Sequence, residues 1–185
     1  MKLKKFKFKS VNSTNDIAIK IIKTSKIKSG MIIAETQKNG RGQYGKKWIS
    51  YKGNLFTTIF FSLDKINLTI KQLTIINCFL VKKLLSYYYK KKIIVKYPND
   101  LIINKQKISG ILQETLVKDN SNYMIVGIGI NLVKNPNIKN YKTTNLLSVT
   151  KRIIYKKKII SDLKNIYENF IKLFYKSKIK NIMKV

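Results

Sequence analysis

The sequence predicts a protein in which a β-sheet packs against α-helices. Apolar residues alternate with lysine near the N-terminus and form short continuous runs later, as in strands, whereas two long segments repeat their apolar residues with a helical period. Gly, Pro, Asn and Asp separate these segments and indicate turns. A chain of 185 residues without internal repeats is expected to form one domain over residues 1–185, with a core at 2–135 and a C-terminal helix at about 157–176.

The first third of the chain is expected to contain three strands and a helix. Residues 2–11 alternate apolar side chains with lysines, which predicts an edge strand. Polar residues at 12–15 supply N-cap candidates for a helix whose apolar residues share one face. Two apolar strands are expected at 30–36 and 54–63. The segment 37–48 between them is therefore predicted to be a long loop at one end of the sheet.

Helical spacing of apolar residues predicts two further helices, at 67–89 and 158–174. Residues 93–96 are predicted to form a short buried strand. This strand would end at the turn 97–100 (YPND), because Pro favours an extended residue before it and Asn and Asp favour turns.

A hairpin is predicted after this turn, with strands at 101–103 and 107–116 joined by a turn at 104–105. Residues 123–132 (YMIVGIGINL) are typical of a core strand, and glycine inside a strand often marks the close approach of a ligand or another backbone. The polar segment 135–150 is predicted to be a loop or partly ordered.

The chain is strongly basic, with a formal charge of +31 from 39 Lys and Arg against 8 Asp and Glu. This charge would suit a polyanion, so a basic nucleic-acid-binding module is one interpretation, which predicts binding that falls steeply with salt. The basic residues are nearly all lysines, however, with arginine only at Arg41 and Arg152, and they are dispersed as on a solvated surface. Abundant Lys, Ile, Asn and Tyr also fit an A/T-rich coding bias.

The residue types available for chemistry are limited. The sequence has no His, which excludes His-based acid–base catalysis and a Cys/His zinc site. Its single cysteine, Cys78, excludes an intramolecular disulfide and fits a reducing compartment. We find no signal peptide and no run of roughly 18 apolar residues, so a cytoplasmic protein without membrane association is expected. Any chemistry would use Lys, Asp, Glu or a soluble metal.

The segment 40–48 (GRGQYGKKW) favours an anion-binding loop. Its glycines would let the backbone approach a ligand closely, and its cations could neutralise a carboxylate or phosphate. A basic Gly-rich loop is by itself more often an ordinary turn. The interpretation therefore depends on the other motifs of the chain.

Five motifs follow one another in order along the chain. They are STN at 13–15, Gln37 with GRG at 40–42, KYPND at 96–100, KISGIL at 107–112 and GIGIN at 127–131. Each alone has an ordinary interpretation as a cap, turn or strand end. Together, over about Asn12 to Leu132, they resemble the catalytic domain of bacterial biotin protein ligases, and the pairing of a GRG loop with KYPND and KxxGIL is specific.

The resemblance implies an α+β catalytic domain, with a mixed β-sheet packed with helices, of the biotin/lipoate protein ligase type. It implies that the protein binds biotin and ATP, forms biotinyl-5'-AMP, and transfers biotin to one lysine of a biotin carboxyl carrier protein. A carboxylate that attacks an α-phosphate brings like charges together, so cations and Mg²⁺ must offset the repulsion. The resemblance gives these catalytic roles to Arg41, Lys107 and Asp100, with Asp100 binding Mg²⁺ through oxygen.

Similarity to the family also assigns binding residues. The biotin-binding residues would be Ser13, Thr14, Asn15, Gln37, Gly40, Arg41, Gly42, Lys107, Gly110 and Gly129. The first four would hydrogen-bond biotin's ureido ring and nearby polar atoms, and the last two would make room for biotin. The nucleotide-binding residues would be Trp48, Asn99, Asn131, Gln43 and Lys46, with Trp48 stacking on adenine.

The chain departs from the family pattern at two places. Where the family commonly has a second arginine (GRGRxGR), this chain has Gln43, which can hydrogen-bond a phosphate but cannot neutralise it. We therefore expect weaker retention of biotinyl-5'-AMP and some unselective labelling of lysines. We also expect neither the SH3-like β domain that most relatives carry after the last helix nor a DNA-binding helix-turn-helix domain before Lys2.

Other interpretations stay open. A lipoate or octanoyl ligase or transferase of the same fold also acylates a carrier lysine, although its loop signature, RRxSGGG with a following His, is absent. An inactive remnant is another possibility, against which the retained Arg41, Asp100 and Lys107 argue. An exposed sheet edge would also allow a homodimer.

Overall fold

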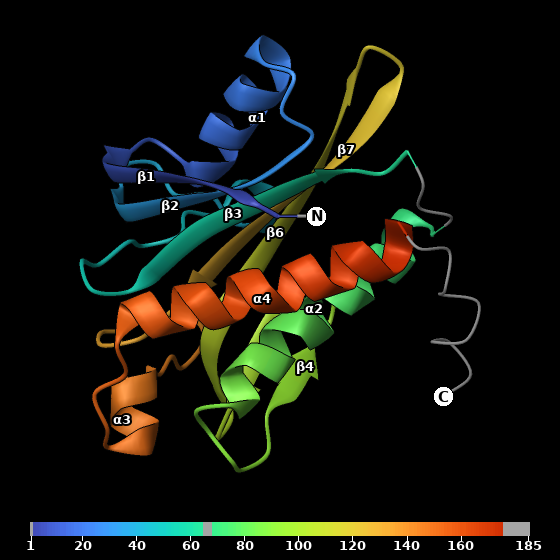
Figure 1. The fold of residues 1–185 in the computed structure, drawn as a ribbon. Helices are drawn as coiled ribbons and strands as arrows, with labels where there is room; N and C mark the ends of the chain where they lie inside the picture. The colour runs from blue at the N-terminus through green and yellow to red at the C-terminus, as the bar shows by residue number, and fades with distance from the viewer. Residues whose placement is uncertain (1, 65–67, 176–185) are drawn as a thin grey trace.

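The computed structural model describes residues 2–64 and 68–175 and has a single mixed β-sheet at its centre (Figure 1). The strands are β1 (Lys4–Val11), β2 (Ser29–Gln37), β3 (Leu55–Ser62), β4 (Ile94–Lys96), β5 (Asp100–Ile103), β6 (Gln106–Lys118) and β7 (Ser121–Ile130). The helices are α1 (Thr14–Thr24), the 3-10 turn η1 (Gln43–Gly45), α2 (Ile70–Ser86), α3 (Leu146–Thr150) and α4 (Lys156–Tyr175). The expected helix start at Asn67 and helix end at Lys176 lie outside the described residues.

The sheet has seven strands in the order β1-β2-β3-β7-β6-β5-β4. β1 and β2 pair in parallel, and every other neighbouring pair is antiparallel. The predicted α+β class, with a mixed sheet packed with helices, is therefore confirmed. The prediction that the first strand lies at a sheet edge is also confirmed, whereas a homodimer through such an edge stays a prediction.

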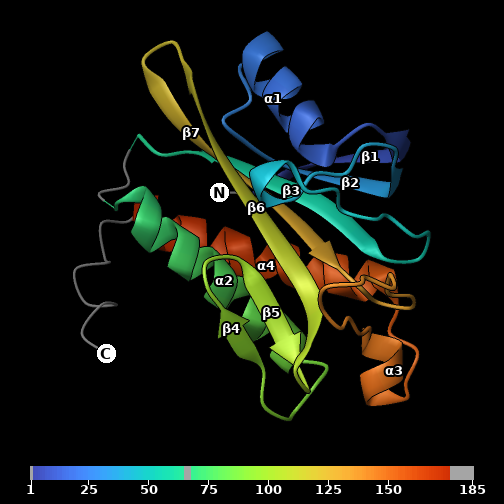
Figure 2. The ribbon, with the colours of Figure 1, turned by 180° about the vertical axis from the view of Figure 1, so that it is seen from behind.

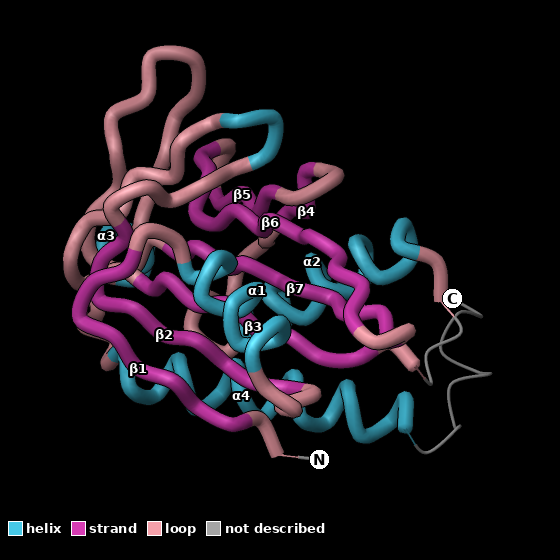
Figure 3. The backbone as a smooth tube through the Cα atoms, turned by 90° about the horizontal axis from the view of Figure 1, so that it is seen from above, coloured by secondary structure: helices cyan, strands magenta, loops and turns pink. Residues whose placement is uncertain are grey.

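The helices cover the sheet from both sides. Along β2, Met31 and Ile33 belong to the large core that includes α2 and α4, whereas Ile32 between them packs with Ala18 and Ile22 of α1. This follows from the period of two in a strand. In Figure 1 α4 crosses in front of the sheet, and Figure 2, seen from behind, shows the strands in front of α2 and α4. In Figure 3 β1 and β2 lie between α1 and α4.

A buried polar chain connects α4 to α2 and β6 inside the larger core. Tyr167 of α4 is fully buried, and its hydroxyl donates to Oδ1 of Asn77 in α2 at 2.9 Å. Nδ2 of Asn77 donates to Oε1 of Gln113 in β6 at 2.7 Å. Because buried polar groups are costly without partners, these bonds fix how the helices sit on the sheet.

A second contact joins α4 to the start of the chain. Oε1 of Glu168 accepts a hydrogen bond from the backbone N–H of Leu3 at 2.6 Å and also pairs with Lys164. Burial alone would raise the pKa of Glu168, but the hydrogen bonds from Lys164 and Leu3 and the nearby positive charges outweigh it and lower this pKa.

Two predictions about single elements need correction. Residues 93–96 were expected to form a buried strand, but β4 is an outer strand of the sheet, and Ile94 is 45% exposed. The segment 135–150 was expected to be a loop or partly ordered, and it departs from this at its last five residues, which form the helix α3, where the side chain of Asn145 accepts a hydrogen bond from the N–H of Ser148 at 2.8 Å. Among the described helices, none combines the length and hydrophobicity required to cross a membrane.

Candidate functional site

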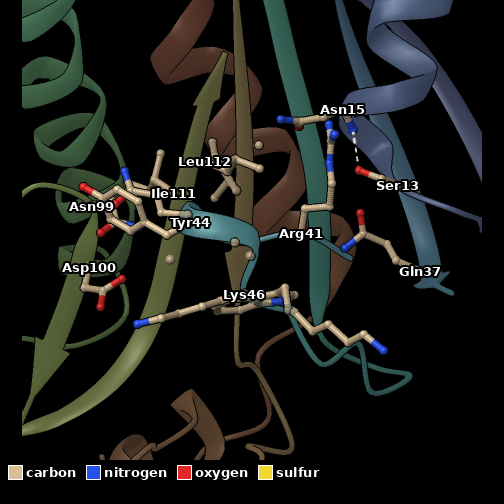
Figure 4. Close-up of a pocket in the computed structure, with 18 of the residues that line it drawn as sticks. Ser13, Asn15, Gln37, Arg41, Tyr44, Lys46, Asn99, Asp100, Ile111 and Leu112 are labelled. Atoms are coloured by element: carbon tan, nitrogen blue, oxygen red, sulfur yellow. Dashed lines mark hydrogen bonds between the residues drawn. The ribbon is translucent and has the colours of Figure 1, made fainter. Parts of the chain in front are cut away.

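A pocket of about 210 Å³ lies where the segment 40–48, called the glycine loop below, meets the start of α1 and strands β6 and β7 (Figure 4). The predicted site residues Ser13, Thr14, Asn15, Gln37, Arg41, Gly42, Gln43, Lys46, Trp48, Asn99, Asp100, Lys107, Gly110 and Gly129 all line it. The fold thus brings motifs from distant parts of the chain to one place.

One end of the pocket holds a hydrogen-bonding network of hydroxyl and amide groups at the start of α1. Oε1 of Gln37 accepts from the backbone N–H of Thr14 at 2.9 Å and from its hydroxyl at 3.0 Å. The hydroxyl of Thr58 in β3 donates to Oδ1 of Asn15 at 2.6 Å and lies 2.8 Å from the Thr14 hydroxyl oxygen. Ser13 caps α1 by accepting from the N–H of Asn15. These bonds fix the polar groups in place before any ligand binds.

The other end of the pocket is an ion pair between the hairpin residues Lys107 and Asp100. Nζ of Lys107 lies 2.7 Å from Oδ1 of Asp100, and the side chains are only 16% and 20% exposed. This Oδ1 is buried and accepts no hydrogen bond from the described residues. The contact with Lys107 is therefore an ion pair by distance, although its angles are not those of a hydrogen bond. The ammonium group also lies 5.5 Å from the ring of Trp48 and 5.4 Å from that of Tyr141. Both rings are within the distance at which an aromatic face attracts a cation.

The indole of Trp48 packs against two glycines of the sheet. A Cβ atom on Gly129 would lie 2.3 Å from Cε2 of Trp48, and one on Gly110 would lie 2.7 Å from Cζ3. Any side chain at these positions would therefore collide with the ring. The glycines of β7 were predicted to mark the close approach of a ligand or another backbone, but at Gly129 the approaching group is the side chain of Trp48. Nε1 of Trp48 is buried without a hydrogen-bond partner among the described residues.

The glycine loop forms a narrow ribbon that closes at Gly40. The N–H of Trp48 donates to the carbonyl of Gly40 at 2.8 Å, and the N–H of Gly42 donates to the carbonyl of Lys46 at 2.6 Å. At the tip, Tyr44 has φ 55° and Gly45 has φ 71°, so the turn uses left-handed conformations that glycine adopts readily. Tyr44 is 90% exposed, which places the tip of the loop in solvent.

Arg41 connects the loop to α1 and to β6. Its Nη2 atom lies 3.0 Å from Oδ1 of Asp16 and 2.9 Å and 3.1 Å from the two oxygens of Glu114. Figure 4 shows the Arg41 side chain extending toward Asn15, away from Asp100. The guanidinium group therefore already has two carboxylate partners.

Two predicted site residues do not line this pocket. Gly40 is buried at the base of the loop, where a Cβ atom would lie 2.5 Å from the carbonyl oxygen of Trp48, so it shapes the loop. Asn131 lines a smaller neighbouring cavity together with Tyr141. Its Nδ2 donates to the carbonyl of Thr144 at 3.0 Å, whereas its Oδ1 is buried without a described partner.

Some lining residues were not predicted as site residues. They include Tyr44, Lys47, Tyr141 and Gly127. Gly127 could have been found from the sequence, because it begins the GIGIN motif. The structure shows that it makes room for Asn15, whose Oδ1 would lie 2.4 Å from an added Cβ. Nothing in the sequence marks Tyr141 as a site residue, because it lies in a polar segment whose path depends on the folded sheet. In the described part of the chain, no three residues of the types His, Cys, Asp and Glu are grouped as a metal site.

Comparison with known proteins gives three kinds of similarity. The model of the Biotin/lipoate A/B protein ligase family matches residues 7–131. The bifunctional ligase/repressor BirA of Escherichia coli (strain K12) is 33% identical over 125 residues, which cover 66% of this chain and 38% of that protein. The biotin--[acetyl-CoA-carboxylase] ligase of Paracoccus denitrificans is 29% identical over 128 residues, which cover 68% of this chain and 53% of that protein.

The fold has a similar neighbour among solved structures. The biotin protein ligase from Aquifex aeolicus, solved in complex with biotin and ATP, superposes with a TM-score of 0.78 and 25% identity over 95% of this chain and 73% of that one. The matching region thus spans less than two-fifths of the E. coli relative but most of the Aquifex structure.

Proposed function

Because the chain belongs to the biotin/lipoate A/B protein ligase family, we propose that it joins biotin to a protein lysine in two steps that consume ATP. In the first step, a biotin carboxylate oxygen attacks the α-phosphorus of ATP, biotinyl-5'-AMP forms and pyrophosphate leaves. In the second step, the lysine amine of a biotin carboxyl carrier protein attacks the acyl carbon and AMP leaves. The biotin ligase relative from Paracoccus denitrificans and the biotin and ATP in the Aquifex structure support biotin as the substrate.

The observation that carries this proposal is the pocket's two different ends. Hydroxyl and amide groups of Ser13, Asn15 and Gln37 line one end, and the Lys107–Asp100 ion pair lies at the other. A ligand with a neutral polar ring and a carboxylate on an apolar chain matches this division. The ureido ring of biotin would bind at the polar end, and its carboxylate would meet ATP beside Lys107.

We propose that Lys107 offsets the repulsion between the two negative groups that react in the first step. The carboxylate and the α-phosphate repel each other, and a fixed ammonium group between them would stabilise the transition state. Its position is set by Asp100 and by the rings of Trp48 and Tyr141. Asp100 and Tyr141 can keep the amine in place when Trp48 moves, which limits the reorganisation needed when the substrates bind.

Mg²⁺ is the metal that this chemistry implies, and Asp100 fits it. Mg²⁺ at nucleotide sites is usually held by one or two carboxylates together with phosphates and waters. Among the described residues, Oδ1 of Asp100 is buried without a hydrogen-bond donor, and Asn99 beside it lines the same pocket. Because the Lys107 ammonium lies 2.7 Å from this oxygen, the ion would share the carboxylate with Lys107. We propose that Asp100 holds the ion, with Asn99 beside it orienting the nucleotide. When bound, Mg²⁺ would offset the negative charge of the phosphates.

Nucleotide binding requires that Trp48 move. Its indole fills the space over Gly110 and Gly129, which were predicted to make room for biotin. We propose that the ligand takes this space and that the displaced indole stacks on adenine. Gln43 and Lys46 of the same loop, together with Asn131 in the neighbouring cavity, would complete the nucleotide site.

Transfer to a carrier domain tests the proposal. Purified protein is incubated with biotin, Mg²⁺, ATP and a biotin carboxyl carrier domain, and modification is measured by mass spectrometry and streptavidin blot. We expect ATP-dependent addition of one biotin, which disappears when the acceptor lysine of the carrier is replaced by Arg. A carrier that stays unmodified at millimolar ATP would contradict the proposal. Octanoyl or lipoyl transfer to a lipoyl domain in place of biotin would instead establish the alternative substrate.

A further inference from the structure

The carboxylate of Glu114 contacts two residues of the pocket wall, Arg41 and Asn15, which come from different regions of the chain. Both of its oxygens lie within 3.1 Å of Nη2 of Arg41 in the glycine loop. One of them also accepts a hydrogen bond from Nδ2 of Asn15, at the start of α1, at 2.6 Å. Glu114 itself lies on β6, and its register partner is Ile125, which belongs to the core beneath α1. The carboxylate therefore joins the loop and the helix to the rigid sheet.

The network continues from Asn15 into the polar end of the pocket. Oδ1 of Asn15 accepts from Thr58, whose hydroxyl also contacts Thr14, and Thr14 donates to Gln37. Asn15 is buried and its amide packs over Gly127, so it has little freedom to turn. A change at Glu114 would thus reach the groups proposed to bind the ureido ring.

Arg41 differs from the other cations of its loop. Lys46 and Lys47 also line the pocket, and within the described residues neither forms an ion pair, whereas Arg41 pairs with both Asp16 and Glu114. The chain uses arginine at only two positions among its 39 basic residues, and a guanidinium group suits contact with several carboxylate oxygens at once. The positive charge of Arg41 is therefore already paired with two carboxylates of the protein.

We infer that Glu114 is a positioning residue and that Arg41 acts as a clamp on the glycine loop instead of contacting the substrate's negative charge. Glu114, assisted by Asp16, holds Arg41 and Asn15 so that the loop and the start of α1 keep the shape that receives biotin. Lys46, Lys47 and Lys107 then supply the positive charge that faces an anionic ligand. This inference rests on the proposed function, since it concerns how the same pocket binds biotin.

A positioning role and a purely electrostatic role for Glu114 predict opposite changes in biotin affinity when its charge is removed. Biotin and ATP are anions, so loss of a nearby carboxylate should by Coulomb's law strengthen their binding. If Glu114 positions the wall, its replacement by an apolar residue should weaken biotin binding, because Arg41 and Asn15 lose a shared charged partner. The sign of the change therefore separates positioning from simple electrostatics.

The test measures biotin affinity by calorimetry and adenylate formation by steady-state kinetics for four variants. Glu114→Met should raise Kd and KM for biotin about tenfold, the size expected for a lost charged hydrogen bond, with kcat within about threefold of wild type. Glu114→Gln should recover most of this loss, because Gln can still accept from Asn15. Arg41→Met should resemble Glu114→Met, and the double variant should be no worse than either, since both break the same contact.

The matched control is Glu35→Met, which removes the same charge from β2 outside this network. It should leave the Kd for biotin within about twofold. Tighter or unaltered biotin binding in Glu114→Met, or additive losses in the double variant, would overturn the inference. A wild-type protein that neither binds biotin nor forms the adenylate would instead contradict the proposed function, so the two failures are distinguishable.

Discussion

Replacing Lys107 by Met gives the sharpest test of how the pocket works. Met keeps an apolar stem but removes the ammonium group, which lies 2.7 Å from Asp100 and near the rings of Trp48 and Tyr141. If this group stabilises the charge that develops at the α-phosphate, its loss should lower the rate of adenylate formation by about 100-fold or more, as for other fixed donors at reacting oxygens.

The same variant should have a limited effect on stability. The Lys107 and Asp100 side chains are 16% and 20% exposed, so the pair lies between a surface ion pair and a buried one. Leaving Asp100 unpaired should cost about 1–3 kcal/mol. In a protein of this size each kcal/mol should lower Tm by about 2–4 °C. Adding Asp100→Asn should recover stability but not activity, because the unpaired charge is gone while the ammonium group is still missing.

The assay is single-turnover formation of biotinyl-5'-AMP, with circular dichroism and thermal unfolding on the same samples. Lys105→Met, at the exposed turn two residues earlier, is the matched control and should retain wild-type rates. A Lys107→Met protein that forms the adenylate within tenfold of wild type would refute the catalytic role. A collapsed circular dichroism spectrum would show that Lys107 is chiefly structural.

Three further predictions concern the loop, the core and the dependence of stability on pH. Gln43→Arg should reduce the release of biotinyl-5'-AMP into solution, measured by labelling of a bystander protein, because a cation would then face the phosphate; unaltered release would exclude this role. Tyr167→Phe should cost about 1–2 kcal/mol in urea unfolding, since Oδ1 of Asn77 loses its donor; no loss would show that the core relaxes around it. The pKa of Glu168 is lowered in the folded protein, so its contribution to stability is present above its unperturbed pKa of 4.5 and is lost as pH falls through the folded value. Glu168→Gln should therefore be less stable than wild type at neutral pH, by less than about 1 kcal/mol, and the difference should shrink near pH 3; a constant difference would contradict this reasoning.

The elements that were predicted well are those with a strong local pattern. The alternation before Val11, an N-cap among residues 12–15 and the helical spacing in α4 each depend on neighbouring residues and are found in the structure, with Ser13 as the cap. The burial of β4 was predicted wrongly because it depends on the order of strands in the sheet, which a four-residue pattern does not contain. α3 was missed because it has five residues and lies in a polar segment.

In the candidate site too, local motifs could be predicted, whereas contacts that depend on the whole fold could not. The motifs that contain Asn15, Arg41, Lys107 and Gly129 could be placed in one pocket by their resemblance to a family, and the structure brings them together. The partners of these residues could not be predicted. Glu114 lies far from Arg41 in the sequence and belongs to an ordinary strand pattern, so its contact exists only after the sheet and the loop have folded.

The most direct test of the account is whether the protein makes biotinyl-5'-AMP without any carrier. Protein at micromolar concentration is mixed with biotin, Mg²⁺ and ATP labelled at the α-phosphate, and the products are separated by chromatography. The account predicts biotin-dependent transfer of the label to biotinyl-5'-AMP, with one pyrophosphate released for each adenylate formed. Label that stays in ATP and AMP whether or not biotin is present would contradict it.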